Sequence, residues 1–214
     1  MGNRCYVAKI DIEKKEIELF YNHWNGGFSS IVPMLEIAKQ LKLDFNGFAK
    51  LNEKAYNEGT VLNEVIKIDE NFSVAKFIDK YDCYDNRIYF IDKDLNLRAR
   101  YFKNLVYCHE DLEYEFSETA DYVIEKADLK IKSSDIKYDK YIFTDLKYID
   151  KHISLQEFLE LFKPSDDKNI NTLKVLNKSI EYLNIGLHNE DFEAIKVVEK
   201  ILSDLVDDLG AKNE

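Results

Sequence analysis

The chain has 214 residues, of which 45% are hydrophobic and 33% are charged, and its formal net charge is -11. This composition is typical of a globular protein and excludes a disordered one. The acidic balance argues against direct nucleic-acid binding, which needs clustered Lys and Arg to displace counterions from phosphates. An acidic surface can instead bind the basic groove of another protein, although in many proteins acidity only favours solubility.

The sequence has no run of about eighteen apolar residues, and its first residues lack the apolar core of a secretion signal. The three cysteines, Cys5, Cys83 and Cys108, contain no CxxC pair, which favours reduced thiols over disulfides or a zinc site. We therefore expect a cytoplasmic protein that contacts no membrane and holds neither metal nor cofactor.

The N-terminal region predicts a β-hairpin followed by a helix. Apolar and polar residues alternate from Cys5 to Asp11 and again over residues 17–21, with a charged break between the two runs. Apolar residues then recur at helical spacing from Ile31 onwards. Ser29 or Ser30 is the expected N-cap of this helix, and Pro33 is expected in its first turn, where a missing N–H is harmless.

Between the hairpin and the helix lies the sequence Asn-His-Trp-Asn-Gly-Gly over residues 22–27, with the only Trp and the only Gly-Gly pair of the chain. Glycines allow backbone angles and close approaches that a Cβ forbids, and a helix N-terminus favours anions. Two interpretations stay open: a tight buried corner, or a site for an anion such as a signalling nucleotide. The candidate ligand-binding residues are Arg4, His23, Trp24, Asn25, Gly26, Gly27 and Ser29.

The secondary structure of the middle of the chain is predicted less clearly. Residues 45–56 fit a second helix, and residues 61–68 fit either a helix or a strand. A second hairpin is predicted over residues 87–91 and 95–101, joined by an Asp-Lys-Asp turn.

The most acidic segment covers residues 110–125 and contains no Lys or Arg. Aromatic side chains lie among its carboxylates, and such a combination can supply both charge and binding anchors. A solvated face is the alternative interpretation. The candidate partner-binding residues are Glu110, Asp111, Glu113, Tyr114, Glu115, Glu118 and Asp121.

Two strand-like runs follow, at residues 122–131 and 138–148. A capping box, Ser154 to Glu157, predicts a short helix through Leu161, and helical spacing then continues over residues 173–183 and 192–209. The predicted organisation is an α+β domain over residues 1–150, with an antiparallel sheet built from hairpins and at least one packed helix. A helical C-terminal region over residues 151–214 follows, which would self-associate if its apolar stripe were exposed.

Three motifs carry a resemblance: Gly-Asn-Arg at residues 2–4, Tyr-Asn-His-Trp-Asn-Gly-Gly at residues 21–27, and Tyr-Asp-Asn-Arg-Ile-Tyr-Phe-Ile-Asp at residues 84–92 with Leu-Asn-Leu at residues 95–97. They resemble a family of small bacteriophage and prophage proteins without an assigned activity. The resemblance covers roughly residues 1–105 and implies a phage or mobile-element origin in a bacterial host cell. It implies no catalytic residue.

The leading hypothesis is therefore a non-enzymatic inhibitor, such as an anti-CRISPR protein. Its partner would be a host protein, most simply a nucleic-acid-binding defence component, bound through the acidic segment. The second hypothesis is a small-molecule or signalling-nucleotide binder that uses the Gly26-Gly27 corner. The third is a Cys-dependent hydrolase, because a nearby His23 could activate a Cys5 thiolate. Cys108 and His109 are adjacent and lack the spacing of a zinc site.

Overall fold

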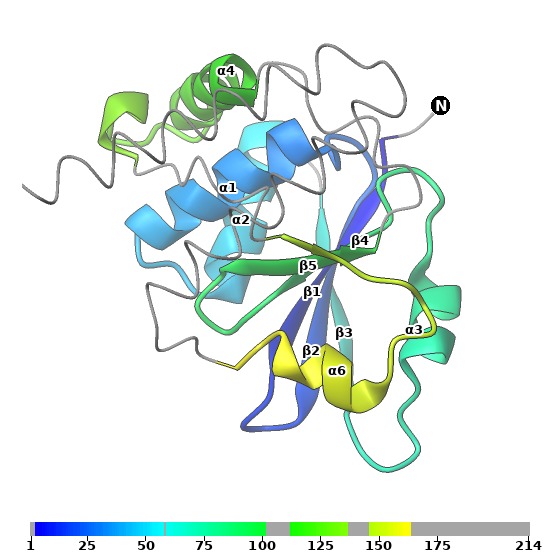
Figure 1. Ribbon diagram of the computed structural model, residues 1–214. Coiled ribbons are helices and arrows are strands. Elements are labelled where there is room, and N and C mark those ends of the chain that lie inside the picture. The colour runs from blue at the N-terminus through cyan, green and yellow to red at the C-terminus, as the bar shows by residue number, and fades with distance from the viewer. Residues whose placement is uncertain (1–2, 58, 102–111, 137–145, 164–214) are drawn as a thin grey trace, which may run out of the picture. The chain divides into compact units, whose positions relative to one another are not determined.

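The structure, a computed structural model, describes residues 3–57, 59–101, 112–136 and 146–163, all of which belong to one compact unit. The expected α+β class is confirmed. A six-stranded sheet forms the centre, and helices cover both of its faces (Figure 1). The helices predicted within residues 173–209 lie outside the described residues.

The sheet combines the two predicted hairpins. Its strands are β1 (Cys5–Asp11), β2 (Glu16–Asn22), β3 (Thr60–Lys67), β4 (Ile88–Ile91), β5 (Leu97–Tyr101) and β6 (Lys147–Tyr148), in the spatial order β3-β2-β1-β4-β5-β6. Both hairpins, β1-β2 and β4-β5, are antiparallel as predicted. The pairs β1-β4 and β5-β6 are parallel, however, so the sheet is mixed.

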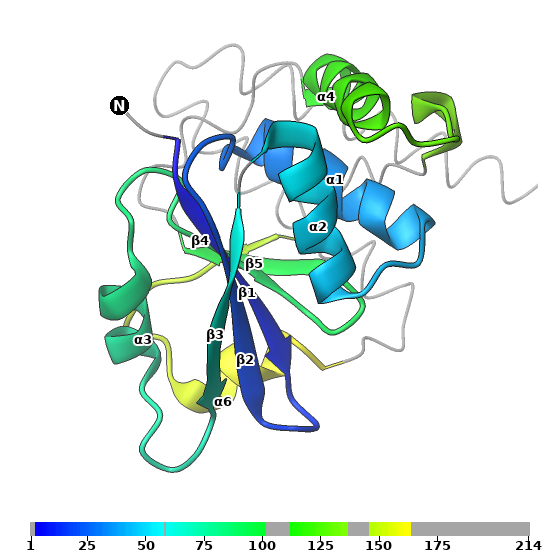
Figure 2. The same cartoon turned by 180° about the vertical axis from the view of Figure 1, so that it is seen from behind.

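Two layers of helices flank the sheet (Figures 1 and 2). Helices α1 (Phe28–Gln40) and α2 (Phe45–Tyr56) cover one face, where Phe28 contacts Tyr89 and Phe48 contacts Phe20. Helices α3 (Val74–Tyr81) and α6 (Leu155–Glu160) cover the other face, where both contact Phe90. Because Tyr89 and Phe90 are neighbours in β4, their side chains point to opposite faces.

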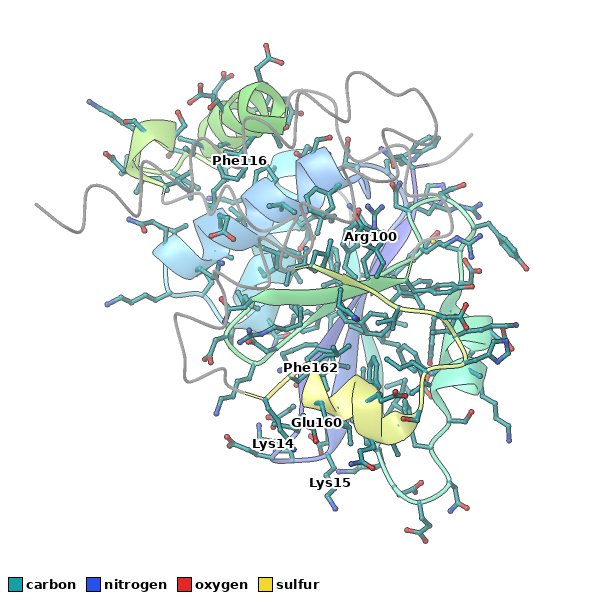
Figure 3. The ribbon with its side chains drawn as sticks, in the orientation of Figure 1. Lys14, Lys15, Arg100, Phe116, Glu160 and Phe162 are labelled. Carbon is teal, nitrogen blue, oxygen red and sulfur yellow. The ribbon has the colours of Figure 1, made fainter. Side chains whose placement is uncertain are left out.

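Helix α4 (Leu112–Lys126) packs on the outside of α1 and α2. Its buried side chains are Phe116, Ala120 and Val123, with Ala127 directly after its end. Figure 3 shows Phe116 on the side of α4 that faces α1. Helix α1 is therefore covered on two sides, which explains why every residue from Ile31 to Ala38 is buried.

The structure corrects several local predictions. Helix α1 begins at Phe28 with Gly27 as its N-cap, so Ser29 and Ser30 lie inside the first turn and Pro33 is the sixth helical residue. The Asp44 side chain, which caps α2, accepts a hydrogen bond from the Gly47 N–H at 2.7 Å. The undecided segment after α2 is strand β3, and helix α3 was not predicted.

The predicted strand over residues 122–131 is wrong, because α4 continues to Lys126 and a turn follows. The prediction depended on the local run Tyr-Val-Ile, whose members favour strands. The side chains at 116, 120, 123 and 127 recur at helical spacing, and packing that stripe against α1 and α2 outweighs the local preference. The predicted strand over residues 138–148 lies mostly outside the described residues, apart from β6.

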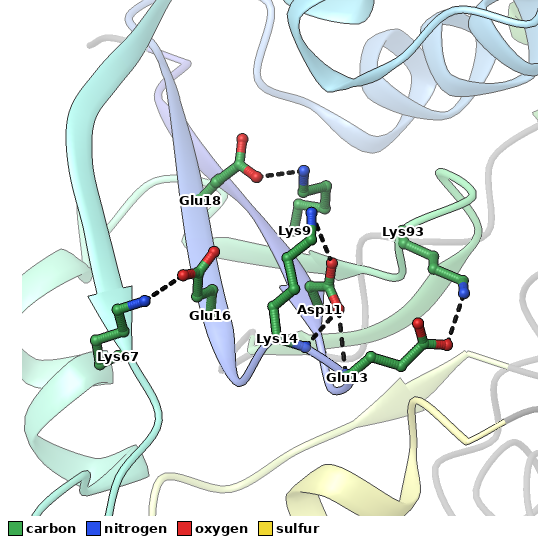
Figure 4. Close-up of polar contacts among 8 residues, drawn as sticks. All are labelled: Lys9, Asp11, Glu13, Lys14, Glu16, Glu18, Lys67 and Lys93. Carbon is green, nitrogen blue, oxygen red and sulfur yellow. Dashed lines mark hydrogen bonds and ion pairs between the residues drawn. The ribbon is translucent and has the colours of Figure 1, made fainter.

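The β1-β2 turn lies at the end of the hairpin opposite the Gly-Gly corner. Polar contacts gather around this turn (Figure 4). Asp11 accepts backbone hydrogen bonds from Glu13 at 3.1 Å and Lys14 at 3.0 Å, and these bonds lower the pKa of its carboxyl group. Cross-strand ion pairs join Lys9 to Glu18 and Lys67 to Glu16. Both ion pairs join residues that lie directly opposite each other, so they favour the observed register of the first three strands.

Candidate functional site

The three motifs meet at one edge of the sheet. We call this region the corner edge: residues 3–4 before β1, residues 23–27 after β2, and residues 82–87 before β4. Strands β1 and β4 are parallel and therefore begin at the same edge, while the antiparallel β2 ends there. The register that pairs Cys5 with Asn22 and Tyr6 with Ile88 places the three segments side by side.

Hydrogen bonds connect these segments directly. The Gly26 N–H donates to the Asn3 carbonyl at 2.7 Å, and the Asn86 N–H donates to the Arg4 carbonyl at 2.9 Å. The side chains of Asn3 and Asn86 are also hydrogen-bonded. The Tyr89 hydroxyl donates to the Gly26 carbonyl at 3.0 Å from within the core. The corner edge is thus one connected network built from segments distant in sequence.

Gly26 is required by space and not by backbone angle. A Cβ at this position would lie 2.5 Å from the Asn3 carbonyl oxygen and 2.8 Å from the Cys5 nitrogen, both of them backbone atoms. Asn25, instead of Gly26, adopts the left-handed backbone conformation, with φ of 55°. Gly27 has an ordinary φ of -66°, and a Cβ there would meet only side-chain atoms, at 3.4 Å or more. The predicted close approach therefore belongs to Gly26 alone.

The corner is open to solvent. Trp24 has 45% of its surface exposed, and His23 is also exposed, with its Nδ1 3.1 Å from the Tyr21 hydroxyl. The rings of His23 and Trp24 meet edge to face, 5.2 Å between centroids. The backbone at Gly26 is buried, whereas the tryptophan that precedes it by two residues is not. The ligand-binding hypothesis therefore stays a prediction.

The start of helix α1 belongs to this edge. Its N-cap, Gly27, has no side chain to satisfy the first amides, and no acidic residue lies in the first turn. Ser29 lies in that turn, half-buried. The helix dipole gives such an end a partial positive charge.

Two ion pairs border the corner edge. The Arg4 guanidinium donates to Asp85 at 2.7 Å, and this hydrogen bond lowers the pKa of the Asp85 carboxyl group. Arg87 pairs with Asp82 and lies over the rings of Tyr84 and Tyr101. The loop is locally strained, because Tyr84 and Arg87 both have left-handed φ, of 66° and 58°.

Sequence reasoning missed two residues of this edge. Arg100 is only 2% exposed; its guanidinium lies 4.5 Å from the centre of the Tyr89 ring and donates to the Asn86 side chain at 3.3 Å (Figure 3). Tyr84 is 79% exposed. Arg98 and Arg100 alternate with apolar residues in β5, a pattern that predicts an exposed polar face, so no local signal marked Arg100 as buried. Tyr84 opens the third motif but was not among the candidate site residues.

The second candidate site is the outer face of α4. We use this name for Glu118, Asp121, Tyr122 and Glu125, which are all exposed and lie on the side of the helix opposite its buried stripe. The helix places Glu113, Tyr114 and Glu115 in its first turn, but their side chains are not described, and Glu110 and Asp111 lie outside the described residues. For the described part, the acidic residues do fall on one face.

Aromatic contacts fix the outer face of α4 to the body of the protein. Tyr122 stacks on Tyr56 with ring centroids 5.5 Å apart, and Lys54 donates to the Ala127 carbonyl at 2.8 Å. Tyr56 forms a side-chain hydrogen bond with Ser30, and burial raises the pKa of Tyr56 to about 12. Lys126 lies beside the acidic group, with its Nζ 5.6 Å from the centre of the Tyr122 ring and 3.6 Å from the Glu125 carboxylate.

The hydrolase hypothesis receives no support from Cys5. The Cys5 side chain is fully buried, and burial raises the pKa of its thiol well above the ordinary value. A thiolate nucleophile needs the opposite shift and access to substrate. His23 is exposed and contacts Tyr21 and Trp24.

Metal-type side chains do not gather in threes or more anywhere in the described parts of the chain. Cys108 and His109 lie outside these parts. Among the helices that the structure describes, none combines the length and hydrophobicity that a membrane span requires. Comparison with models of known protein families, with curated proteins and with solved structures finds no match to this chain.

Proposed function

We propose that the protein is a non-enzymatic inhibitor, encoded by a phage or mobile element, that binds a nucleic-acid-binding host defence protein such as a CRISPR component. The outer face of α4 would occupy a basic groove that normally holds phosphates. The observation that supports this proposal is the segregation of Glu118, Asp121 and Glu125 to the exposed side of one well-packed helix.

The charge of this face and the order of its helix would both favour binding. Three carboxylates within two helical turns produce a local negative potential, which accelerates encounter with a basic partner. Tyr122 on the same face adds a large, rigid contact area. Because α4 is fixed through Tyr56 and Lys54, little ordering entropy would be lost on binding.

The test is a pull-down of the tagged full-length protein from bacterial host lysate, with the captured proteins identified by mass spectrometry. Three chains are compared: the wild type, the triple variant Glu118→Lys, Asp121→Lys, Glu125→Lys, and a control triple, Glu53→Lys, Glu70→Lys, Asp94→Lys. The control changes three exposed carboxylates elsewhere and produces the same net charge.

A stoichiometric nucleic-acid-binding partner that the wild type and the control capture, and the α4 triple variant does not, supports the proposal. Binding should also weaken as salt rises. A partner captured equally by all three chains contradicts it, as does the absence of any nucleic-acid-binding partner.

A second candidate function is the binding of a signalling nucleotide at the corner edge, which the exposure of Trp24 next to the start of α1 favours. Trp24 is the only tryptophan, so its fluorescence reports on this corner alone. Saturable quenching by a nucleotide in a panel of mono- and cyclic dinucleotides would support this function. No change at millimolar concentrations would dismiss it.

A further inference from the structure

We infer that Asn25 is a site of spontaneous deamidation that the folded corner edge blocks and that becomes reactive when residues 3–4 separate from this edge. The co-reactant is water, and the products are ammonia and an aspartate or isoaspartate at position 25. This site is independent of the proposed inhibitor function. The chain contains two Asn-Gly dipeptides, at residues 25–26 and 46–47. Asparagine deamidates most readily before glycine, which has no side chain to hinder ring closure.

The reaction joins the Asn25 side chain to the backbone of Gly26. Hydroxide removes the Gly26 amide proton, the Gly26 nitrogen bonds to Asn25 Cγ, and the side-chain nitrogen leaves as ammonia with a proton from water. Water then opens the resulting succinimide ring at either of its carbonyl carbons, which gives aspartate or isoaspartate. The reaction therefore requires a Gly26 N–H that hydroxide can reach, and it converts this nitrogen into an imide nitrogen without a hydrogen.

In the folded protein, the Gly26 N–H is engaged. It donates to the Asn3 carbonyl at 2.7 Å, and Gly26 is buried. Because an imide nitrogen has no hydrogen to donate, ring closure must break this bond. Gly26 also has little room to move, since a Cβ at this position would lie 2.5 Å from the Asn3 carbonyl oxygen. Deamidation of Asn25 therefore requires that residues 3–4 first leave the corner edge.

The second Asn-Gly dipeptide is protected in a different way. The Gly47 N–H donates to the Asp44 side chain at 2.7 Å in the first turn of α2, where Asn46 is exposed. This bond joins residues of one turn and opens when the helix end frays, whereas the bond at Gly26 joins segments distant in sequence. Each bond can therefore be weakened without the other, and residues 46–47 provide an internal control.

Deamidation through isoaspartate would prevent the corner edge from closing again. Isoaspartate carries the main chain through its side-chain Cβ, which adds one carbon to the backbone between Trp24 and Gly26. Gly26 lies against Asn3 without space for a further atom, so the lengthened chain no longer matches this position. A single opening followed by reaction would leave a lasting change in the corner edge.

The experiment compares three full-length chains: the wild type, Asn3→Gly and Asp44→Ala. Asn3→Gly removes the side-chain hydrogen bond that holds residue 3 to Asn86, and Asp44→Ala removes the acceptor of the Gly47 N–H. The folded chains are incubated at mildly alkaline pH, together with wild type in urea. Peptide mapping by mass spectrometry then measures the rate of deamidation at each dipeptide. Circular dichroism verifies that each variant is folded.

We expect the two dipeptides to react at similar rates in urea. Folding should slow the reaction at Asn25 by about tenfold or more, because it requires opening of an ordered segment. Asn3→Gly should accelerate the reaction at Asn25 and not at Asn46, and Asp44→Ala should do the reverse. Equal rates at Asn25 in the folded and the urea-denatured wild type would overturn the inference. So would an absence of reaction at Asn25 in urea, or a rate at Asn25 that Asn3→Gly leaves unchanged.

Hydrogen exchange of the Gly26 amide, followed by NMR, tests the same protection without a variant. This amide should exchange much more slowly in the folded wild type than in the unfolded chain. Exchange as fast as in the unfolded chain would overturn the inference, because the Gly26 N–H would then be open to hydroxide. In the isolated isoaspartate form, the Gly26 amide should have lost its protection, and slow exchange there would contradict the lasting change.

Discussion

Gly26 and Gly27 are adjacent in sequence but differ in what the fold demands of them. The Gly26 Cα faces the backbone of residues 3–5, whereas Gly27 faces the Asn3 side chain, which can move. Gly26→Ala should lower the free energy of unfolding by about 1–3 kcal/mol, because the strand itself must shift. Gly27→Ala is the matched control and should change it by no more than about 1 kcal/mol in either direction.

Urea denaturation followed by far-ultraviolet circular dichroism measures this difference. Equal stability of the two variants would show that the close approach at Gly26 is not what holds β1 against the corner. The comparison is useful because both substitutions add the same atoms and act on neighbouring residues of the same loop.

Among the elements, the short helix α6 illustrates how local signals and packing cooperate. Ser154 accepts a hydrogen bond from the Glu157 N–H at 3.2 Å, and Glu157 accepts one from the Ser154 N–H at 3.1 Å, as the predicted capping box requires. A six-residue helix is marginal by itself, so packing against the core, in which Phe158 contacts Phe90 and Phe162, must supply most of its stability.

Ser154→Ala should therefore reduce the stability of the whole unit by about 1 kcal/mol without abolishing folding, because it removes one cap from a helix that packing retains. Ser154→Asp restores an N-cap acceptor and should recover most of the loss. Thermal unfolding of the three chains tests this. A variant Ser154→Ala that unfolds as the wild type does would mean that core packing alone holds α6.

For the whole molecule, ionisable groups set a window of pH in which the fold is stable. Among the residues that the structure describes, hydrogen bonds from neighbouring groups lower the pKa of five carboxyl groups, those of Asp11, Glu64, Asp85, Asp128 and Glu157. A carboxyl group with a lowered pKa stabilises the fold above its unfolded pKa, and this contribution disappears as the pH falls through the folded value. The urea concentration at the midpoint of denaturation should therefore decrease once the pH falls below about 4.

At high pH, the stability of the fold is limited by groups whose pKa is raised. Burial raises the pKa of Cys5, and burial raises that of Tyr56 from 10.0 to about 12. These groups ionise more readily in the unfolded chain, so stability should fall as the pH rises between 10 and 12. Tyr56→Phe, which cannot ionise, should show a shallower decline there. An identical alkaline profile for Tyr56→Phe and the wild type would contradict the assignment.

Much of the local structure could be predicted from the sequence. Both hairpins follow from alternation of apolar and polar residues, α1 from helical spacing after Gly27, and α6 from its capping box, because each is encoded by residues a few positions apart. The acidic segment was also identified, although its helical conformation was not. The sequence suggested strand where Tyr122 continues a helix, because local β preference and helical spacing compete there.

The association of the three motifs was decided only by tertiary structure. The parallel pairing of β1 with β4 joins segments about eighty residues apart, and no local pattern encodes the partner of a strand. That pairing places Arg100 beneath the corner, gives Gly26 its close neighbour in Asn3, and leaves Trp24 exposed at the edge of the sheet. The sequence by itself determined the elements and the negative charge, since these depend on neighbouring residues. Packing of distant segments determined which side chains form a surface.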